Sequence, residues 1–365
     1  MQINLLPSDY IIYTLFFLSI ICGFYIRTQP HLREPWKKVF SNKGAIICSI
    51  ILCIYIAIGL LDSLHFSVTS NSGAQQKSLL DLMIQPLGTQ DEKTYSAPLA
   101  THLYQMEGGD YAQLKYPGTH ILGTNKIGQD MFYETIKSVR TGLLIGTLTT
   151  VFMLPFALFF GMIAGYFGGF IDDLVQYLYT TLSSIPGVLL ITAMILVMQV
   201  VISNHPTLFP TIAERADARL LTLCFILGVT SWSSLCRLLR GETLKLREQE
   251  FVTAAIAMGA RKFPIIIRHI LPNVMHIIII TTVLDFSGLV LAEAILSYVG
   301  VGVDPTTASW GNMINTSRLE LAREPMVWWP LLSALCTMFF LVLSANLFAD
   351  SVRDAFDPRL GTCTE

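Results

Sequence analysis

The chain has 365 residues, of which 53% are apolar and 14% are charged, and its formal net charge is −2. A soluble domain carries about 25% charged residues. This deficit, together with several apolar runs long enough to cross a bilayer, excludes a soluble globular protein and indicates a helical integral membrane protein.

The first predicted element is the apolar run from Tyr10 to Ile26. It has the length of a signal sequence, but no basic segment precedes it, so we interpret it as a membrane span. Arg27 to Lys43 then carries five Lys or Arg residues against a single acid. Short basic flanks stay in the cytoplasm, which predicts an extracytoplasmic N-terminus. Residues 1–43 are therefore an extra N-terminal helix with a basic cytoplasmic linker.

Residues 44–138 are predicted to hold a second span, Gly44 to Leu61, and a long extracytoplasmic loop. Four tyrosines are scattered through this loop: Tyr95, Tyr104, Tyr111 and Tyr116. They indicate a packed cap rather than a disordered tether. Glycines and Asn125 mark turns near the end of the loop. Asp130 is placed to cap a helix that enters the bilayer.

Residues 139–349 are predicted to form the transmembrane core. The five spans expected there are Thr141 to Gly165, Ile185 to Ile202, Leu220 to Cys236, Val274 to Ser297 and Val327 to Ala349. Glycines along the first of them allow close helix approach in lipid, and Pro155 predicts a kink. The total of seven spans places the tail, residues 350–365, in the cytoplasm.

One loop of this core, residues 250–273, reads EFVTAAIAMGARKFPIIIRHILPN. The pattern predicts two short helices hinged at Gly259 and closed by Leu271-Pro272-Asn273. Seven Lys or Arg residues stand against three acids between Arg237 and Asn273, which predicts a cytoplasmic loop. Isolated helices this short have marginal stability in water, so we expect the loop to dock against a partner. An amphipathic interfacial linker is the alternative that the residues leave open.

Five segments follow one another in a suggestive order: HILGTNKIGQD, GYFGGFIDDL, LREQEFVTAAIAMGARKFPIIIRHILPN, LAEAILSYVGVGVDPTTASWGNM and NLFADSVRDAFDPRL. Together they resemble the permease subunits of binding-protein-dependent ABC importers, specifically the C-type subunit of oligopeptide and dipeptide importers. The resemblance covers about two thirds of the chain. It implies an all-α, polytopic fold of about seven transmembrane helices with a type I importer core, in a bacterial inner membrane.

The resemblance implies that residues 250–273 are a coupling loop, which lies in a groove on a separate ATPase. The residues expected to couple are Phe251, Thr253, Ala254, Ala255, Met258, Gly259, Arg261, Lys262 and Pro272. The alanines permit close contact, and Gly259 allows the chain to reverse. Arg261 and Lys262 are expected to pair with acids on the ATPase. The family usually has Glu where Thr253 stands, so any salt bridge of that Glu cannot form here.

The implied partners are a homologous second permease subunit in a heterodimer, two cytoplasmic ABC ATPase subunits, an extracytoplasmic peptide-binding protein and the lipid bilayer. No nucleic acid is expected. The sequence has no GxxxxGK[ST], HExxH or GxSxG motif, so we expect no catalytic residue and no bound cofactor, with ATP used by the ATPase partner. The histidines lack metal-ligand spacing and most cysteines lie in apolar runs, so no metal site is expected.

Two acids in the sixth predicted span are candidates for the translocation pathway. An ionisable side chain at the centre of a span costs roughly 3 kcal/mol on insertion scales. Asp285 is expected either to contact a passing peptide amine or to hydrogen-bond Thr281, Thr282 or the partner permease. Glu293 is expected to organise an outer gate rather than to bind substrate.

Three functions remain open from the sequence. The first is import of peptides as one permease subunit of a heterodimer. The second is a permease for nickel, another small ligand or antimicrobial peptides. The third is a membrane anchor or assembly protein that binds partners through its long outer loop. An anchor has no need of a helix–Gly–helix element between two spans, so the loop at residues 250–273 favours a transporter.

Overall fold

The computed structural model describes residues 2–3, 6–28, 30–70, 73–84, 88, 90–104, 112–205 and 211–356. Six helices in these ranges are long and apolar enough to cross a membrane. They are α3 (Lys43–Asp62), α6 (Met131–Phe167), α8 (Gly187–Asn204), α9 (Ile212–Arg247), the continuous segment Lys262–Val299 and α14 (Trp329–Phe356). The expected class, a helical polytopic membrane protein, is confirmed.

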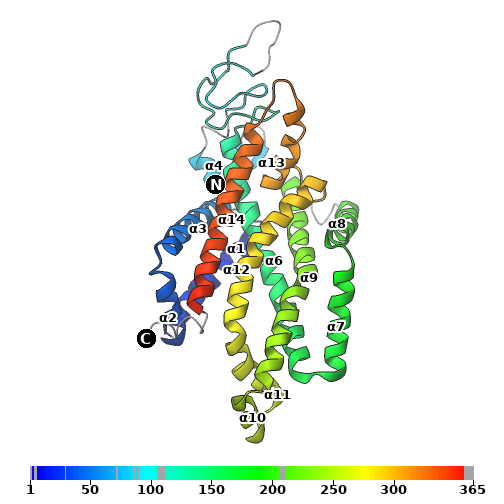
Figure 1. Ribbon diagram of the computed structural model, residues 1–365. Coiled ribbons are helices and arrows are strands. Elements are labelled where there is room, and N and C mark those ends of the chain that lie inside the picture. Colours follow the sequence, from blue (N-terminus) through cyan, green and yellow to red (C-terminus); the bar gives the residue numbers. More distant parts are fainter. Residues whose placement is uncertain are drawn as a thin grey trace.

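The long helices lie side by side and give the molecule two distinct ends (Figure 1). We call the end that carries α10 (Glu250–Ala257) and α11 (Lys262–Ile265) the lower end. The upper end carries α13 (Trp310–Ser317). Helix α14 runs downward and finishes toward the same end as the predicted coupling loop.

Helices α6 and α9 form the central pair, and both extend well beyond the spans predicted for them. Hydropathy identifies only the part of a helix that lies in lipid. The polar ends of α6 and α9 were therefore not included in the predicted spans. Glycines bring the two backbones together, as the sequence predicted. A Cβ on Gly165 would lie 2.6 Å from Thr243 Cβ, and one on Gly228 would lie 2.5 Å from Phe152 Cβ. Larger residues there would push the helices apart.

The predicted turn at Gly165 to Asp173 is present between α6 and α7 (Gly169–Ser184). Gly168 and Gly169 adopt φ values of 66° and 55°, which glycine tolerates best. The turn itself contains no Lys or Arg, but α9 supplies both charges that reach it. Arg240 pairs with Asp172, and Arg247 donates to the Tyr166 carbonyl at 3.1 Å. The hydrogen bond from Arg240 holds the pKa of Asp172 below its usual value.

The extra N-terminal helix is α1 (Pro7–Thr28), followed by α2 (Pro30–Val39). Helix α1 has 22 residues, and its stretch Pro7–Ile21 is apolar. Six of the predicted spans are thus found among the described residues. Helix α1 lies where the seventh was predicted, and its crossing of the membrane stays a prediction.

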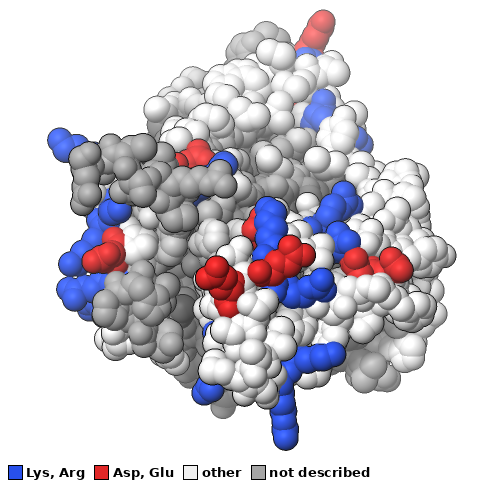
Figure 2. Space-filling view, turned by 60° about the horizontal axis from the view of Figure 1, so that its bottom comes forward, with Lys and Arg blue, Asp and Glu red and all other residues white. Residues whose placement is uncertain are grey.

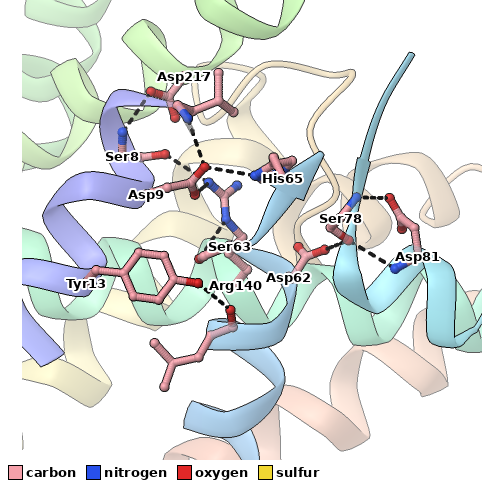
Figure 3. Close-up of polar contacts among 12 residues, drawn as sticks. Ser8, Asp9, Tyr13, Asp62, Ser63, His65, Ser78, Asp81, Arg140 and Asp217 are labelled. Carbon is pink, nitrogen blue, oxygen red and sulfur yellow. Dashed lines mark hydrogen bonds and ion pairs between the residues drawn. The ribbon is translucent and has the colours of Figure 1, made fainter. Parts of the chain in front are cut away.

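A buried polar cluster ties the start of α1 to the upper part of the core (Figure 3). Asp9, which is fully buried, lies 2.5 Å from Arg140 Nη2 of α6 and 2.8 Å from His65 Nδ1. The backbone amide of Ser8 donates to Asp217 of α9 at 3.1 Å. We call these five residues the upper cluster. They show that α1 is attached to the bundle and does not lie apart from it.

A small antiparallel sheet lies beside this cluster. It consists of β1 (Gln2–Ile3), β2 (His65–Ser70) and β3 (Gly73–Ser78), in that order. Helix α4 (Leu79–Met83) follows directly, and Ser78 caps it. The Ser78 hydroxyl also donates to Asp62 at the end of α3, at 2.7 Å.

The rest of the described outer loop is packed, as the tyrosine pattern predicted. Tyr95 is only 2% exposed, and the ring of Tyr104 meets that of Trp329 edge-on with centroids 4.8 Å apart. Tyr111 lies outside the described residues. Asp130 caps α6 by accepting hydrogen bonds from the amides of Phe132 and Tyr133 at 2.8 and 3.1 Å. The predicted cap at Asp130 is therefore confirmed.

Helix α12 (Leu271–Val299) rises to the upper end, where α13 and the short 3-10 turn η2 (Glu320–Ala322) connect it to α14. Trp310 at the start of α13 is 1% exposed. A Cβ on Gly142 of α6 would lie 2.6 Å from its ring. The segment after Gly300 is thus in part a packed plug over the upper end of the bundle.

Candidate functional site

The loop at the lower end turns at Gly259, where the sequence predicted a hinge. Helix α10 ends at Ala257, and Gly259 adopts a φ of 83°. The amide of Ala260 donates back to the Ala255 carbonyl at 3.0 Å, and that of Gly259 to Ile256 at 2.9 Å. This pair of bonds is a Schellman motif, whose left-handed position favours glycine. Nothing lies within 4 Å of a Cβ built there, so backbone conformation alone selects glycine.

Helix α10 has one face against the bundle and one face free. Val252 and Ala255 are 0% and 3% exposed and belong to the core formed with α6, α7 and α9. Phe251, Ile256 and Met258 are 41%, 50% and 81% exposed. Ala255 therefore supports α10 from behind and does not lie on its free face, whereas Met258 is the most prominent apolar side chain at the tip.

The remaining residues expected to couple lie around this free face. Ala254 and Thr253 are exposed. The Thr253 hydroxyl donates to the Glu250 carbonyl at 2.9 Å, within its own helix. Arg261 and Lys262 are exposed as well, and Lys262 Nζ lies 5.4 Å from the ring of Phe167. Figure 2 shows Lys and Arg side chains interleaved with Asp and Glu over the lower end.

The expected break at Leu271-Pro272-Asn273 is absent. Residues Ile266–Ile270 form a π-helical segment, η1, which joins α11 to α12 without interruption. Pro272 has no N–H to offer the preceding turn, and the wider π turn accommodates its ring. The Asn273 side chain donates to the His269 carbonyl at 2.6 Å. Movement of the lower tip is therefore connected directly to a membrane-crossing helix.

Two exposed apolar residues next to the tip were not singled out from the sequence. Phe263 and Ile267 are 60% and 62% exposed and follow α10 on α11 and η1. The sequence does contain a sign of this exposure, since both residues stand between Lys262 and Arg268 in a loop predicted to be cytoplasmic. Together with Phe251, Ile256 and Met258 they form what we call the tip surface.

Asp285 lies midway along α12 and is partly exposed. The expected hydrogen bonds to threonine are absent: the Thr281 hydroxyl donates to the Ile277 carbonyl at 2.8 Å, and the buried Thr282 hydroxyl has no partner among the described residues. Gly288, on the same face, has nothing within 4 Å of a Cβ position. The carboxyl of Asp285 thus has no hydrogen-bond partner among the described residues.

Glu293, about two turns above Asp285 on α12, has a different environment. It is 2% exposed, and the Ser297 hydroxyl donates to it at 2.7 Å. A Cβ on Gly311 would lie 2.8 Å from its Oε1 atom. Glu293 thus lies between α12 and α13, and its expected part in an outer gate stays a prediction.

No group of three or more His, Cys, Asp or Glu side chains suited to a metal ion occurs in the described parts of the chain. The described cysteines are free.

Comparison with known proteins agrees with this architecture. Residues 157–362 match the family described as "Binding-protein-dependent transport system inner membrane component". The chain is 33% identical over 248 residues to the oligopeptide transport system permease protein OppC of Mycobacterium tuberculosis, which covers 68% of this chain and 79% of the relative.

Two further relatives extend the comparison. The dipeptide transport system permease protein DppC of Alkalihalophilus pseudofirmus is 28% identical over 328 residues, 90% of each chain. OppC of Bacillus subtilis is 30% identical over 241 residues, which is 66% of this chain and 72% of the relative. The chain therefore belongs to the family of binding-protein-dependent transport system inner membrane components.

Proposed function

We propose that this chain is one of two permease subunits of an ATP-driven importer and forms half of a pathway for peptides. The tip surface carries the proposal, because it exposes five large apolar side chains next to Lys and Arg residues, on α10 and at the lower end of the segment Lys262–Val299. An exposed apolar patch with a charged rim is typical of a protein interface. The occupant proposed for it is a cytoplasmic ATPase, one of two in the complex.

The proposed mechanism transmits motion from that ATPase to the pathway. When two ATPase subunits close on ATP, α10 moves with them. Because η1 connects the tip to α12 without a break, α12 moves as a lever and switches the pathway between inward-open and outward-open states. ATP is hydrolysed by the partner, and this chain binds no cofactor.

The proposed orientation places the lower end in the cytoplasm and the N-terminus outside. It is supported by the Lys and Arg residues of α2 and of the tip, which the positive-inside rule assigns to the cytoplasm. The upper end then faces an extracytoplasmic binding protein. Leu319, Met326 and Trp328, exposed by 70%, 51% and 44%, are the proposed contacts.

Peptides are the proposed substrates because the named relatives are oligopeptide and dipeptide permeases. These relatives do not favour the nickel, small-ligand or anchor alternatives. The test is to purify the chain with its homologous permease, its ATPases and its binding protein, and to measure ATP hydrolysis. Peptide-loaded binding protein should stimulate hydrolysis several-fold over peptide-free protein. If no peptide stimulated hydrolysis but a metal complex did, peptide import would be rejected in favour of a permease for nickel or another small ligand.

Asp285 provides a test of the pathway itself. We expect Asp285→Asn to lower peptide uptake about tenfold, because a hydrogen bond to a charged group contributes about 1.5–3 kcal/mol. Uptake by reconstituted vesicles is the measurement. Thr281→Val is the matched control, since its hydroxyl bonds only within the helix, and uptake should stay normal. Unchanged uptake of every peptide by Asp285→Asn would remove Asp285 from the pathway.

A further inference from the structure

The lower ends of α1 and α2 enclose an open pocket of about 610 Å³ that the transport mechanism does not use. The residues that line it are Gly23, Arg27, Arg33, Trp36, Lys37 and Phe40. Half of these are cations, and the others are apolar or aromatic. Figure 2 shows several Lys and Arg side chains with fewer acidic ones at its left edge, the side on which α2 lies in Figure 1.

The three cations form no ion pair among the described residues, and Glu34 is the single acid on α2. Arg27, Arg33 and Lys37 are all exposed. Like charges gathered around one pocket repel each other, so an anion bound between them is favoured. The charge therefore selects a negatively charged ligand.

The walls of the pocket are held in place by packing. Trp36 stacks on Phe40 with ring centroids 6.2 Å apart and meets Phe356 of α14 edge-on at 5.8 Å. Val39 and Val352 are buried beneath them. Helix α1, the opposite wall, is tied to the bundle at its other end by the upper cluster. The pocket is thus a built feature of the fold.

The face of α1 that continues from Arg27 toward the start of the helix is apolar and exposed, and α3 exposes apolar residues as well. Phe17, Ile21 and Phe24 of α1 are 62%, 64% and 65% exposed, and Ile47 of α3 is 59% exposed. On a helix beside membrane spans, such residues face hydrocarbon. A ligand that reaches the cations from this side needs both an anionic group and apolar chains.

We propose that this pocket binds the phosphate headgroup of an anionic glycerophospholipid, whose acyl chains lie along the exposed face of α1 and α3. Basic pockets between helices at the membrane surface recognise anionic lipid headgroups in this way. A free phosphate would use the cations but gain nothing from the apolar wall, so a lipid is the better match. In the proposed orientation the lipid belongs to the cytoplasmic leaflet.

The test is lipid retention by the full-length chain, purified in detergent with the subunits that accompany it. The protein is equilibrated with mixed micelles of phosphatidylcholine and phosphatidylglycerol, and bound lipids are identified by native mass spectrometry. The variant is Arg27→Gln/Arg33→Gln/Lys37→Gln. We expect its phosphatidylglycerol to fall about fivefold for each cation removed, with phosphatidylcholine unchanged.

The matched control is Lys38→Gln/Lys43→Gln/Arg353→Gln, which removes the same charge from exposed residues of the same region that do not line the pocket. It should keep phosphatidylglycerol at the wild-type level. Equal losses in both variants would overturn the site, as would displacement of the lipid by millimolar inorganic phosphate. Lipid retention is measured without any transport. The result therefore tests the lipid site even if the proposed import function proves wrong.

Discussion

Arg140→Ala should be among the most damaging single substitutions in this protein, lowering the free energy of unfolding by about 3–5 kcal/mol. Arg140 Nη2 lies 2.5 Å from Asp9 and 2.9 Å from the Ser8 hydroxyl, and its Nε lies 3.3 Å from the Ser63 hydroxyl. Asp9 is fully buried. Loss of the guanidinium leaves that carboxylate buried with only neutral donors and His65 around it, and desolvation of an unpaired charge is costly.

The measurement is unfolding of the purified protein in mixed micelles of a mild detergent and dodecyl sulfate. Asp9→Ala/Arg140→Ala should lose less than the sum of the two single variants, because the double variant removes both buried charges. Lys245→Ala is the matched control. Its pair with Glu242 is made by side chains that are 72% and 29% exposed, and such pairs contribute under about 1 kcal/mol.

A result in which Arg140→Ala unfolds like Lys245→Ala would show that the upper cluster adds nothing to stability. Proteolysis would then be expected to release α1 at the same rate in wild type and variant. Where the prediction holds, Arg140→Ala should expose the N-terminal segment first, because the contacts of Asp9 and Ser8 join that segment to α6 and α9.

Local signals made most of the architecture predictable. Apolar runs located the six membrane-crossing helices, since each carries its own hydropathy. Gly259 and Asp130 were identified because a left-handed turn and a helix N-cap depend on one residue and its immediate neighbours. The glycines of α6 were recognised for the same reason, as small residues in lipid favour close helix packing.

Other features depend on contacts between distant segments, and the sequence alone did not locate them. The upper cluster joins residues 8, 9, 65, 140 and 217, each of which looks like an ordinary polar residue in its own segment. Ala255 and Ala254 are chemically identical neighbours, yet only packing against the bundle decides that the first is buried. Pro272 predicted a break between two helices, but a π-helical turn before it keeps the helix continuous.

The second large effect is expected at the tip surface. Met258→Asp should lower peptide import by at least tenfold and reduce the amount of ATPase that co-purifies with the membrane subunits. Met258 is 81% exposed in the isolated chain. Burial of such a side chain at an interface contributes about 1.5–3 kcal/mol. An unpaired aspartate in the same position adds a desolvation cost, and each 1.4 kcal/mol is a factor of ten in affinity.

Met258→Leu is the matched control, because it keeps the size and apolar character of the side chain, and import should stay within twofold of wild type. Ala255→Arg would be a poor test of docking. It places a charge among buried residues of the bundle, so lost import there would report misfolding. Normal co-purification and import by Met258→Asp would contradict docking through this surface.

A substitution at Gly259 can distinguish docking of the ATPase from transmission of its movement to the membrane helices. Gly259→Ala keeps Met258 and Phe251 on the surface, but a side chain at a φ of 83° costs about 1–2 kcal/mol. The strain favours a tip that no longer turns back toward η1 and α12. We therefore expect Gly259→Ala to retain the ATPase but to hydrolyse ATP with less peptide imported per ATP, whereas Met258→Asp loses the ATPase. Equal loss of ATPase from both variants would mean that the turn serves docking alone.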